Sequence, residues 1–350
     1  MSKREIVERL RYCYIWYKQV WRSKNDFNVP FPTKVKYAFR GFSANEYHWY
    51  DLKHNNYKDY ISDFRRRKSR NINPPKKLIL DDKLLFEEIF RNYVRVPKVY
   101  AWVSEGNVYG LHGYDISTSS AIDFMRKNRE TVLKWIKGYE GVGTFIILTD
   151  DEGKLVVNGK PMSDEDVRKL FKFKGEAIIT EYMHQSEFEN SLYPNAVNTI
   201  RMVCAKKKGE TTARIIKAAQ RIGNDESAPV DNVSAGAIAC EIDINTGELM
   251  EGVIAKAHHT LDGEKFFSNH PDTGAQLAGK VIPDWDNLKK SVEDVTNKFP
   301  FLNFVAWDVL LTDEGFCLIE GNASSGCMMF QQRHGVMNEE IGDIYRSYGF

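Results

Sequence analysis

Two carboxylates and one amide near the C-terminus could together bind a divalent cation: Asp308, Glu320 and Asn322. Mg²⁺ prefers oxygen ligands in an octahedron and commonly takes one or two carboxylates, while substrate phosphates and water complete the shell. This combination is typical of sites where Mg²⁺ holds the phosphates of a nucleotide. The three residues therefore predict a magnesium–nucleotide site.

A β-hairpin is the element expected to position these side chains. Two apolar, β-rich runs, 304–311 and 316–319, flank a polar turn that ends at Gly315, and this pattern is typical of a hairpin. A three-residue loop with Gly315 in the left-handed conformation would set Thr312 opposite Phe316.

In that register Asp308 lies directly across from Glu320, and Asn322 lies two residues further along the same face. Directly opposed carboxylates repel each other, so we expect a cation between them. Replacing Asp308 by Asn or Glu320 by Gln is then expected to remove activity and leave the fold intact.

A lysine followed by a glycine-rich loop is a second candidate. Lys137 comes at the expected end of a strand and precedes Gly138, Gly141 and Gly143. Glycines let the backbone approach a phosphate, and the lysine supplies a mobile positive charge. The pattern predicts a phosphate-binding loop, although a glycine-rich hairpin turn with an exposed lysine would look the same.

The rest of the chain mixes helices and strands without a repeating βαβ rhythm. Hydrophobic periodicity predicts helices at 5–21, 81–93 and 284–299 and strands at 94–103, 132–136, 144–148, 177–183, 199–205, 213–219 and 235–244. Such an order argues for an α+β fold rather than a doubly wound sheet.

Taken in order, these segments resemble the ATP-grasp superfamily, in which two α+β lobes clamp ATP. The resemblance is carried by the strand–lysine–glycine-loop–strand, by 181–183 at the end of a strand, and by the Asp…Glu-x-Asn hairpin. Further segments are similar to the sugar-transfer-associated ATP-grasp family: 193–201, 220–223, 230–232 with Gly236, His270-Pro271 and 283–285. Together the motifs cover roughly residues 80–335.

This resemblance implies a role for each candidate residue. It implies nucleotide contacts from Lys83, Lys137, Gly138, Gly141, Gly143, Glu181, Tyr182 and Met183, and Mg²⁺ ligation by Asp308, Glu320 and Asn322. Arg201, Arg221 and Lys137 are the catalytic candidates. The guanidinium of an arginine can bind a reacting carboxylate or γ-phosphate in bidentate fashion, and the lysine supplies a mobile positive charge. Ordinary surface arginines beside a strand remain the alternative for Arg201 and Arg221.

The resemblance also implies the reaction. ATP-grasp enzymes typically phosphorylate a carboxylate and let an amine attack the acyl phosphate. The expected function is an ATP- and Mg²⁺-dependent carboxylate–amine ligase, acting on sugar-linked substrates in cell-surface polysaccharide biosynthesis (capsule, exopolysaccharide or O-antigen). A kinase that leaves the γ-phosphate on a hydroxyl and a non-catalytic nucleotide-binding scaffold at a membrane or partner remain alternatives.

Residues 1–77 are strongly basic, with 19 Lys/Arg against 7 Asp/Glu in a chain whose net charge is +1. The densest cluster, 65–68 with Arg70, could bind an anionic substrate, a membrane surface or nucleic acid, or could be a solvated face. Nucleic acid is not expected, because no recognised reading module accompanies the charge. The amphipathic helix within residues 1–24 either packs on the protein or contacts a membrane peripherally.

The expected domains are a basic N-terminal region (1–77), an ATP-grasp part with the glycine loop (78–185) and a C-terminal lobe with the metal hairpin (186–350). No apolar run reaches the ~20 residues of a membrane span, and the start of the chain lacks a signal peptide's apolar block. The five cysteines form no CxxC pair. We therefore expect reduced thiols in a cytoplasmic protein, at most peripheral on the inner face of the membrane.

Overall fold

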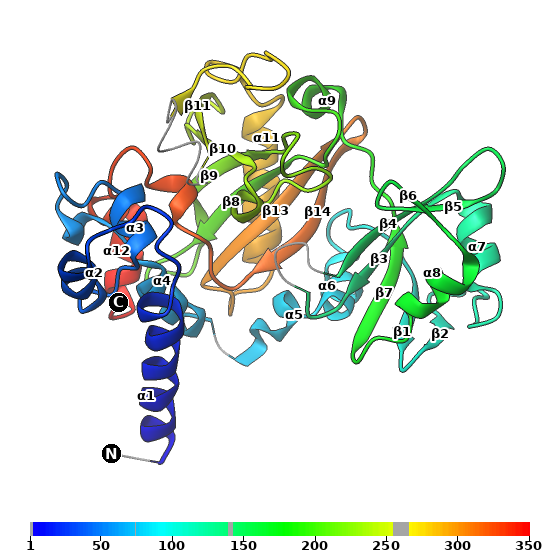
Figure 1. Cartoon of the computed structure of the whole chain (residues 1–350), viewed down its shortest axis with the longest axis horizontal. Helices are drawn as coiled ribbons and strands as arrows, with labels where there is room; N and C mark the ends of the chain where they lie inside the picture. The colour runs from blue at the N-terminus through cyan, green and yellow to red at the C-terminus, as the bar shows by residue number, and fades with distance from the viewer. Residues whose placement is uncertain (1–2, 74, 139–142, 255–265) are drawn as a thin grey trace.

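Two antiparallel sheets form the body of the molecule (Figure 1). The structure is a computed structural model that describes residues 3–73, 75–138, 143–254 and 266–350. Within these residues each sheet has seven strands, and helices cover their faces. The expected α+β class is therefore confirmed.

The first sheet has the strand order β2-β1-β7-β3-β4-β5-β6. One face packs on two helices through a core that includes Leu133, Ile179, Ile122 and Val167. Because neighbouring strand residues point to opposite faces, the residues on either side of Leu133 face away from this core. The strands are β1 (Val99–Ser104), β2 (Asn107–Gly110), β3 (Glu130–Trp135), β4 (Thr144–Thr149), β5 (Leu155–Val157), β6 (Lys160–Met162) and β7 (Glu176–Glu181), and the helices are α7 (Ala121–Asn128) and α8 (Asp164–Leu170).

The second sheet has the order β12-β11-β10-β9-β8-β13-β14. Helix α11 (Trp285–Asn297) lies in the core that covers one face, and α12 (Glu340–Ser347) packs on part of the other. The strands are β8 (Thr199–Ala205), β9 (Arg214–Ile222), β10 (Ile238–Ile242), β11 (Leu249–Ile254), β12 (Phe266–Phe267), β13 (Phe304–Thr312) and β14 (Gly315–Asn322).

The N-terminal helices lie beside this second sheet (Figure 1). Asn73 joins the two parts, because its amide donates to the carbonyl oxygen of Phe304 at 2.6 Å and accepts from the Phe304 backbone N–H at 3.1 Å. The helices are α1 (Lys3–Trp16), continued by a π-helix (Tyr17–Trp21), α2 (Phe31–Ala38), α3 (Ala44–Trp49), α4 (Asp63–Lys68), α5 (Leu78–Asp81) and α6 (Lys83–Phe90); α9 (Glu187–Leu192) follows later in the chain.

The β13–β14 hairpin differs from the expected one in its turn. Thr312 pairs with Gly315 and not with Phe316, so the loop has two residues instead of three. A β-bulge further along then leaves Ile319 without a partner, because Asp308 pairs with Glu320. The extra residue of the bulge offsets the one-residue register shift caused by the shorter loop. The predicted pairing of Asp308 with Glu320 is therefore confirmed.

Several boundaries also differ. The predicted helix at 81–93 is broken at Asp82, whose carboxylate accepts from the backbone N–H groups of Leu84 and Leu85 and so caps α6. The predicted strand at 94–103 begins only at Val99. Among the described residues no helix combines the length and hydrophobicity needed to cross a bilayer.

Candidate functional site

A cavity of about 860 Å³ is lined by residues of both sheets and of the N-terminal region. In the first sheet, Val132 and Lys134 of β3 line the cavity. Both lie on the face of the strand that points away from the helices. From the second sheet it receives the polar face of β8, β9, β13 and β14. The predicted magnesium hairpin is therefore part of this cavity.

Two lysines lie at the junction of the two lobes. Lys83, at the start of α6, donates to the carbonyl oxygen of Gly138 at 2.9 Å, and its Nζ is 3.7 Å from Glu320 Oε2. Lys134 is half-buried, and burial together with the charge of Lys83 lowers its pKa, while Glu320 opposes the shift. Both amines line the cavity and can offer positive charge to an anion.

Opposite the lysines, charged residues form a row across neighbouring strands. Glu320 of β14 pairs with Asp308 of β13, and Asp308 pairs with Arg201 of β8. The guanidinium of Arg201 binds Asp308 through two hydrogen bonds, and Arg221 Nη2 of β9 lies 3.1 Å from Asp308 Oδ2. Both arginines are buried, so the surface alternative does not hold.

Buried charge is stabilised here by pairing. Burial alone would raise the pKa of Asp308, but Arg201 and Arg221 hold it below its ordinary value. Likewise burial disfavours the charged form of Arg221, yet the carboxylates of Asp231 and Asp308 raise its pKa. Nη1 of each arginine has no hydrogen-bond partner in the part of the chain that the structure describes.

The donor set fits a magnesium ion, with a reservation about charge. A carboxylate offers about four lone-pair sites, and the arginines occupy three on Asp308. Glu320 is about one-third exposed (32%) and accepts from the amide of Asn322 at 3.2 Å. The guanidiniums already compensate Asp308, so repulsion between the carboxylates does not by itself require a metal, and the three ligands stay a prediction.

An apolar slot adjoins the lysines and the hairpin. Val132 and Ile146 of the first sheet line the cavity, as do Met183, Leu310 and Ile319, which pack together in one cluster. Such a slot suits a flat, largely apolar ring.

Glu181 and Tyr182 also line the cavity, as does Met183. Met183 has no backbone hydrogen bond among those described outside helices and strands. Its backbone groups remain available to the polar edge of a ring in the apolar slot.

Of the predicted glycine loop, the structure describes only the two ends, 137–138 and Gly143. Lys137 is exposed and is not among the residues that line the cavity, although Gly138 is. Gly141 lies outside the described residues. Gly143 does not line the cavity either; it has φ +80°, and a Cβ there would come within 2.1 Å of the Trp135 ring. The close packing of the Trp135 ring therefore explains why a glycine stands at position 143.

Lys134 was not among the predicted site residues. The sequence did contain a signal for it, because Lys134 is a charged residue within the predicted strand 132–136, whose other residues are mostly apolar. Asp231 was also missed as a charged partner, although its segment was noted; it accepts from the Thr199 hydroxyl at 2.5 Å and lies 3.4 Å from Arg221.

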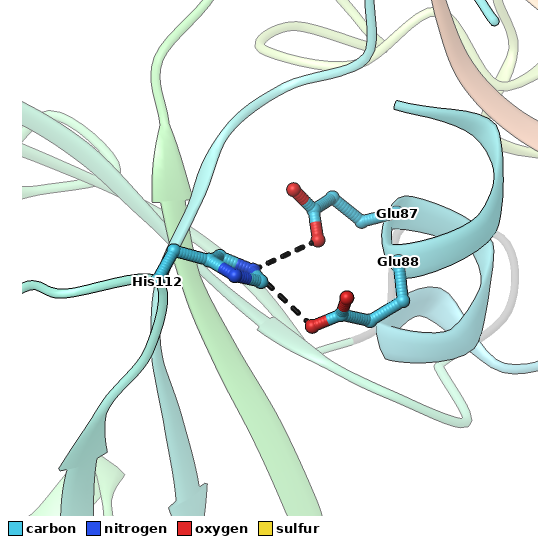
Figure 2. A group of neighbouring side chains, drawn as sticks. All are labelled: Glu87, Glu88 and His112. Carbon is cyan, nitrogen blue, oxygen red and sulfur yellow. Dashed lines mark hydrogen bonds and ion pairs between the residues drawn. The ribbon is translucent and has the colours of Figure 1, made fainter. Parts of the chain in front are cut away.

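A group of metal-type ligands lies elsewhere, at Glu87, Glu88 and His112 (Figure 2). His112 Nε2 is 3.1 Å from Glu87 and 3.3 Å from Glu88. Because the Arg91 guanidinium can only donate, the Nδ1 atom at 2.9 Å accepts, and the ring proton is assigned to Nε2. The carboxylates are thus satisfied by a donor, and the group ties α6 to the segment after β2.

These features define an ATP-grasp protein. A family model described as sugar-transfer associated ATP-grasp matches residues 63–341, and the chain belongs to that family. The predicted superfamily, family and fold are confirmed.

Solved structures with a similar fold share little sequence with this chain. The ATP-grasp ligase PsnB complexed with a minimal precursor is 12% identical with a TM-score of 0.39, covering 79% of this chain and 61% of that chain. D-alanyl-alanine synthetase A from Vibrio cholerae is 11% identical (TM-score 0.42; 73% and 59%). D-alanine–D-alanine ligase from Helicobacter pylori is 10% identical (0.42; 77% and 61%). This chain spans less than two thirds of each of these proteins. No curated protein sequence matches it.

Proposed function

We propose that this protein is an ATP- and Mg²⁺-dependent ligase that joins a carboxylate to an amine through an acyl phosphate. The supporting observation is one cavity in which Lys83 and Lys134 face Glu320 of the metal hairpin, with Arg201 and Arg221 beside it. Phosphoryl transfer depends mainly on positioning and on electrostatic stabilisation, and this arrangement offers both.

Each group has a role in the proposed reaction. The apolar slot holds the purine, and the two lysines bind the phosphates. Glu320, Asn322 and Asp308 would hold Mg²⁺, which neutralises phosphate charge and aligns the reacting oxygens when bound. The Nη1 groups of Arg201 and Arg221 bind the substrate carboxylate or the transferring phosphoryl group.

The reaction proceeds in two steps. A carboxylate oxygen forms a bond to the γ-phosphorus while the bond to the bridging oxygen breaks, which gives an acyl phosphate and ADP. The amine then attacks the acyl carbon, phosphate leaves, and the amine loses a proton. Both steps develop negative charge beside the arginines, which stabilise it.

We also propose that the substrates are sugar-linked and that the reaction belongs to cell-surface polysaccharide biosynthesis in the cytoplasm. The family description, which couples ATP-grasp to sugar transfer, supports the first point. All five cysteines are free thiols, and four of them are buried, which suits a reducing compartment.

Hydroxamate trapping tests the proposal. Protein, Mg-ATP and hydroxylamine are incubated with amino acids, uronic acids and nucleotide-linked uronic acids. We expect a hydroxamate together with ADP, both lost in Glu320→Gln. ADP formation with neither hydroxamate nor free phosphate would indicate the kinase alternative. ATP binding without any ADP across the panel would favour the scaffold alternative.

Residues 1–24 suit contact with an anionic membrane, and we propose this as the place where the protein acts. Helix α1 projects from the body (Figure 1), and Val7, Leu10 and Tyr14 are exposed on it. This segment carries seven Lys/Arg against two Asp/Glu. Apolar and cationic residues together favour the lipid interface.

A further inference from the structure

The cavity extends beyond the nucleotide and metal residues into a compartment walled by the N-terminal region. Glu46, Trp49 and Tyr50 line it together with Asp63, Arg66 and Arg67 of α4. A volume of about 860 Å³ lies toward the upper end of the ~300–1,000 Å³ typical of ligand pockets. The basic cluster seen in the sequence therefore borders the cavity that holds the proposed chemistry.

Helix α4 is held firmly at its start. Ser62 caps it by accepting from the backbone N–H of Arg65, and Glu46 accepts from the backbone N–H of Asp63 at 2.6 Å. Glu46 also belongs to the capping box of α3. The side chains of α4 thus project from a fixed backbone, and this pre-organisation favours binding.

Arg66 connects α4 to the metal hairpin. Its Nη1 donates to the hydroxyl of Ser324 at 3.3 Å, and Ser324 follows Asn322 by two residues. Its other hydrogen bond goes to Asp63, Nε to Oδ1 at 2.7 Å. The guanidinium is therefore beside the segment that leaves the proposed reaction centre.

Charge in this compartment is unbalanced. Arg66 and Arg67 share the single carboxylate of Asp63, because Arg67 Nε donates to Asp63 Oδ2 at 2.8 Å. Burial would raise the pKa of Asp63, but the two arginines lower it. Arg70 is balanced by Asp81 at 3.0 Å. Glu46 is a third carboxylate in this compartment, but burial and the charge of Asp63 raise its pKa to about 7. At neutral pH it therefore offsets the third arginine only in part. The Nη groups of Arg67 have no partner among the described residues.

An aromatic and apolar wall lines the same cavity as the arginines. Trp49 packs with Val233, Met328 and Met329, and all four line the cavity. A surface of apolar and aromatic groups with a few fixed polar ones is typical of small-molecule sites. The compartment suits an organic substrate that carries an anionic group.

Part of the cavity lining on this side lies outside the family match. The match begins at residue 63, whereas Ser43, Glu46, Trp49, Tyr50 and Ile61 all line the cavity. Residues 43–61 therefore lie outside the part of the chain that the family model covers, whereas Arg66 and Arg67 lie within it.

We propose that α4 and residues 43–61 form the binding site of the second substrate, and that Arg67, supported by Arg66, binds its phosphate or carboxylate group. This inference rests on the proposed function for the nucleotide half of the cavity. It assigns the basic N-terminal region to substrate recognition.

Isothermal titration of the whole protein tests the assignment. The nucleotide half is first filled with Mg²⁺ and the β,γ-imido analogue of ATP, and glucose 1-phosphate, acetate or glucose is then titrated. We expect binding of at least one anionic probe and none of glucose; the arms distinguish phosphate from carboxylate. Arg67→Gln should weaken binding of the anionic probe at least tenfold, because it removes a hydrogen bond assisted by charge.

Two further variants keep the test specific. Arg65→Gln removes an exposed arginine of the same helix that does not line the cavity, and it should bind like the parent. Arg67→Lys keeps the charge but loses the planar fork and should be intermediate. Equal affinity of the parent and Arg67→Gln, or no anion binding by the parent, would overturn the inference.

The nucleotide analogue keeps the two hypotheses apart. If it does not bind the parent, the proposed function fails. The anionic probes are then titrated into the protein alone, where a tenfold difference between the parent and Arg67→Gln still supports the second site and equal affinity overturns it.

Discussion

Asp308 combines two tasks, because it is both a predicted metal ligand and the buried partner of two arginines. Removing its charge in Asp308→Asn leaves the guanidiniums of Arg201 and Arg221 under-compensated. Breaking a buried pair in this way costs roughly 3–5 kcal/mol. We expect a fall of that order in the free energy of unfolding, measured by urea denaturation. This result would revise the sequence-based expectation that Asp308→Asn leaves the fold intact. A urea midpoint equal to that of the parent would support that expectation instead.

Glu320→Gln is the cleaner test of the metal site. Glu320 is about one-third exposed and lacks a strong ion pair, since Lys83 is 3.7 Å away. We expect the free energy of unfolding to change by less than ~0.5 kcal/mol. The rate of ADP release should fall at least ~100-fold, since even mutation of residues that only support the metal ligands lowers metal affinity or activity 10–100-fold. Parent-like turnover would exclude Glu320 as a ligand.

Lys134 and Lys137 are competing candidates for the phosphate contact. Lys134 lines the cavity and Lys137 is exposed. Lys134→Met should weaken ATP binding roughly 10-fold or more, since hydrogen bonds to charged groups contribute ~1.5–3 kcal/mol. Lys137→Met should bind like the parent. Calorimetric affinities decide between them, and the opposite pattern would restore Lys137.

The lowered pKa of Lys134 also affects stability. Between its folded pKa and its ordinary value the unfolded chain binds more protons, so stability rises with pH across this range. At neutral pH the buried charge is a cost that Lys134→Met removes. Without nucleotide, this variant should unfold at a higher temperature than the parent, with the difference shrinking as the pH rises toward 10. No difference at neutral pH would contradict the argument.

At the scale of elements, Gly143 tests whether the start of β4 is held by packing. Gly143→Ala adds left-handed strain of ~1–2 kcal/mol and an overlap with Trp135, which stacks on Phe173 at 4.8 Å. Gly153→Ala has the same φ of +80° but nothing within 4 Å, so it reports strain alone. Gly143→Ala should cost a further ~1–3 kcal/mol by overpacking, measured by urea denaturation. Equal losses would exclude the overlap.

The sequence predicted the strands and helices better than the loops and bulges that connect and align them. Strand β8 was predicted with its observed ends, because seven consecutive residues are buried and β-rich. The pairing of Asp308 with Glu320 was predicted through a wrong loop, and no sequence pattern marked the bulge that corrected it. Strand parity, which sets the face that each side chain occupies, adds Lys134 as a candidate beside Lys137, and the phosphate contact of either lysine stays a prediction.

At the scale of the whole molecule, the site depends on contacts between distant parts of the chain. Asn73 binds Phe304, and Gln331 exchanges two hydrogen bonds with the backbone of Ile61, in both cases across more than 200 residues. Periodicity reports only local neighbours, so the sequence showed the basic charge of residues 1–77 but not the cavity that it borders. The domain boundaries at 77 and 185 stay predictions.

The projecting helix α1 gives the last prediction. Its base is held by Trp16, whose Nε1 donates to the Ala38 carbonyl oxygen at 2.8 Å, while Val7 and Leu10 are 59% and 66% exposed. We expect the protein to float with vesicles containing anionic lipid and to be released by salt, since each basic residue near the surface contributes ~1 kcal/mol. The double variant Val7→Glu/Leu10→Glu should lose this binding.

A matched control separates the helix from general surface hydrophobicity. Val281 is 51% exposed elsewhere on the protein, so Val281→Glu should float like the parent. Equal flotation of the double variant and the parent would exclude α1 as the contact. If the parent instead forms a dimer that the double variant lacks, and does not float, the exposed face binds a second copy of the chain. Only binding to anionic vesicles through α1 would place the proposed ligase at a membrane surface.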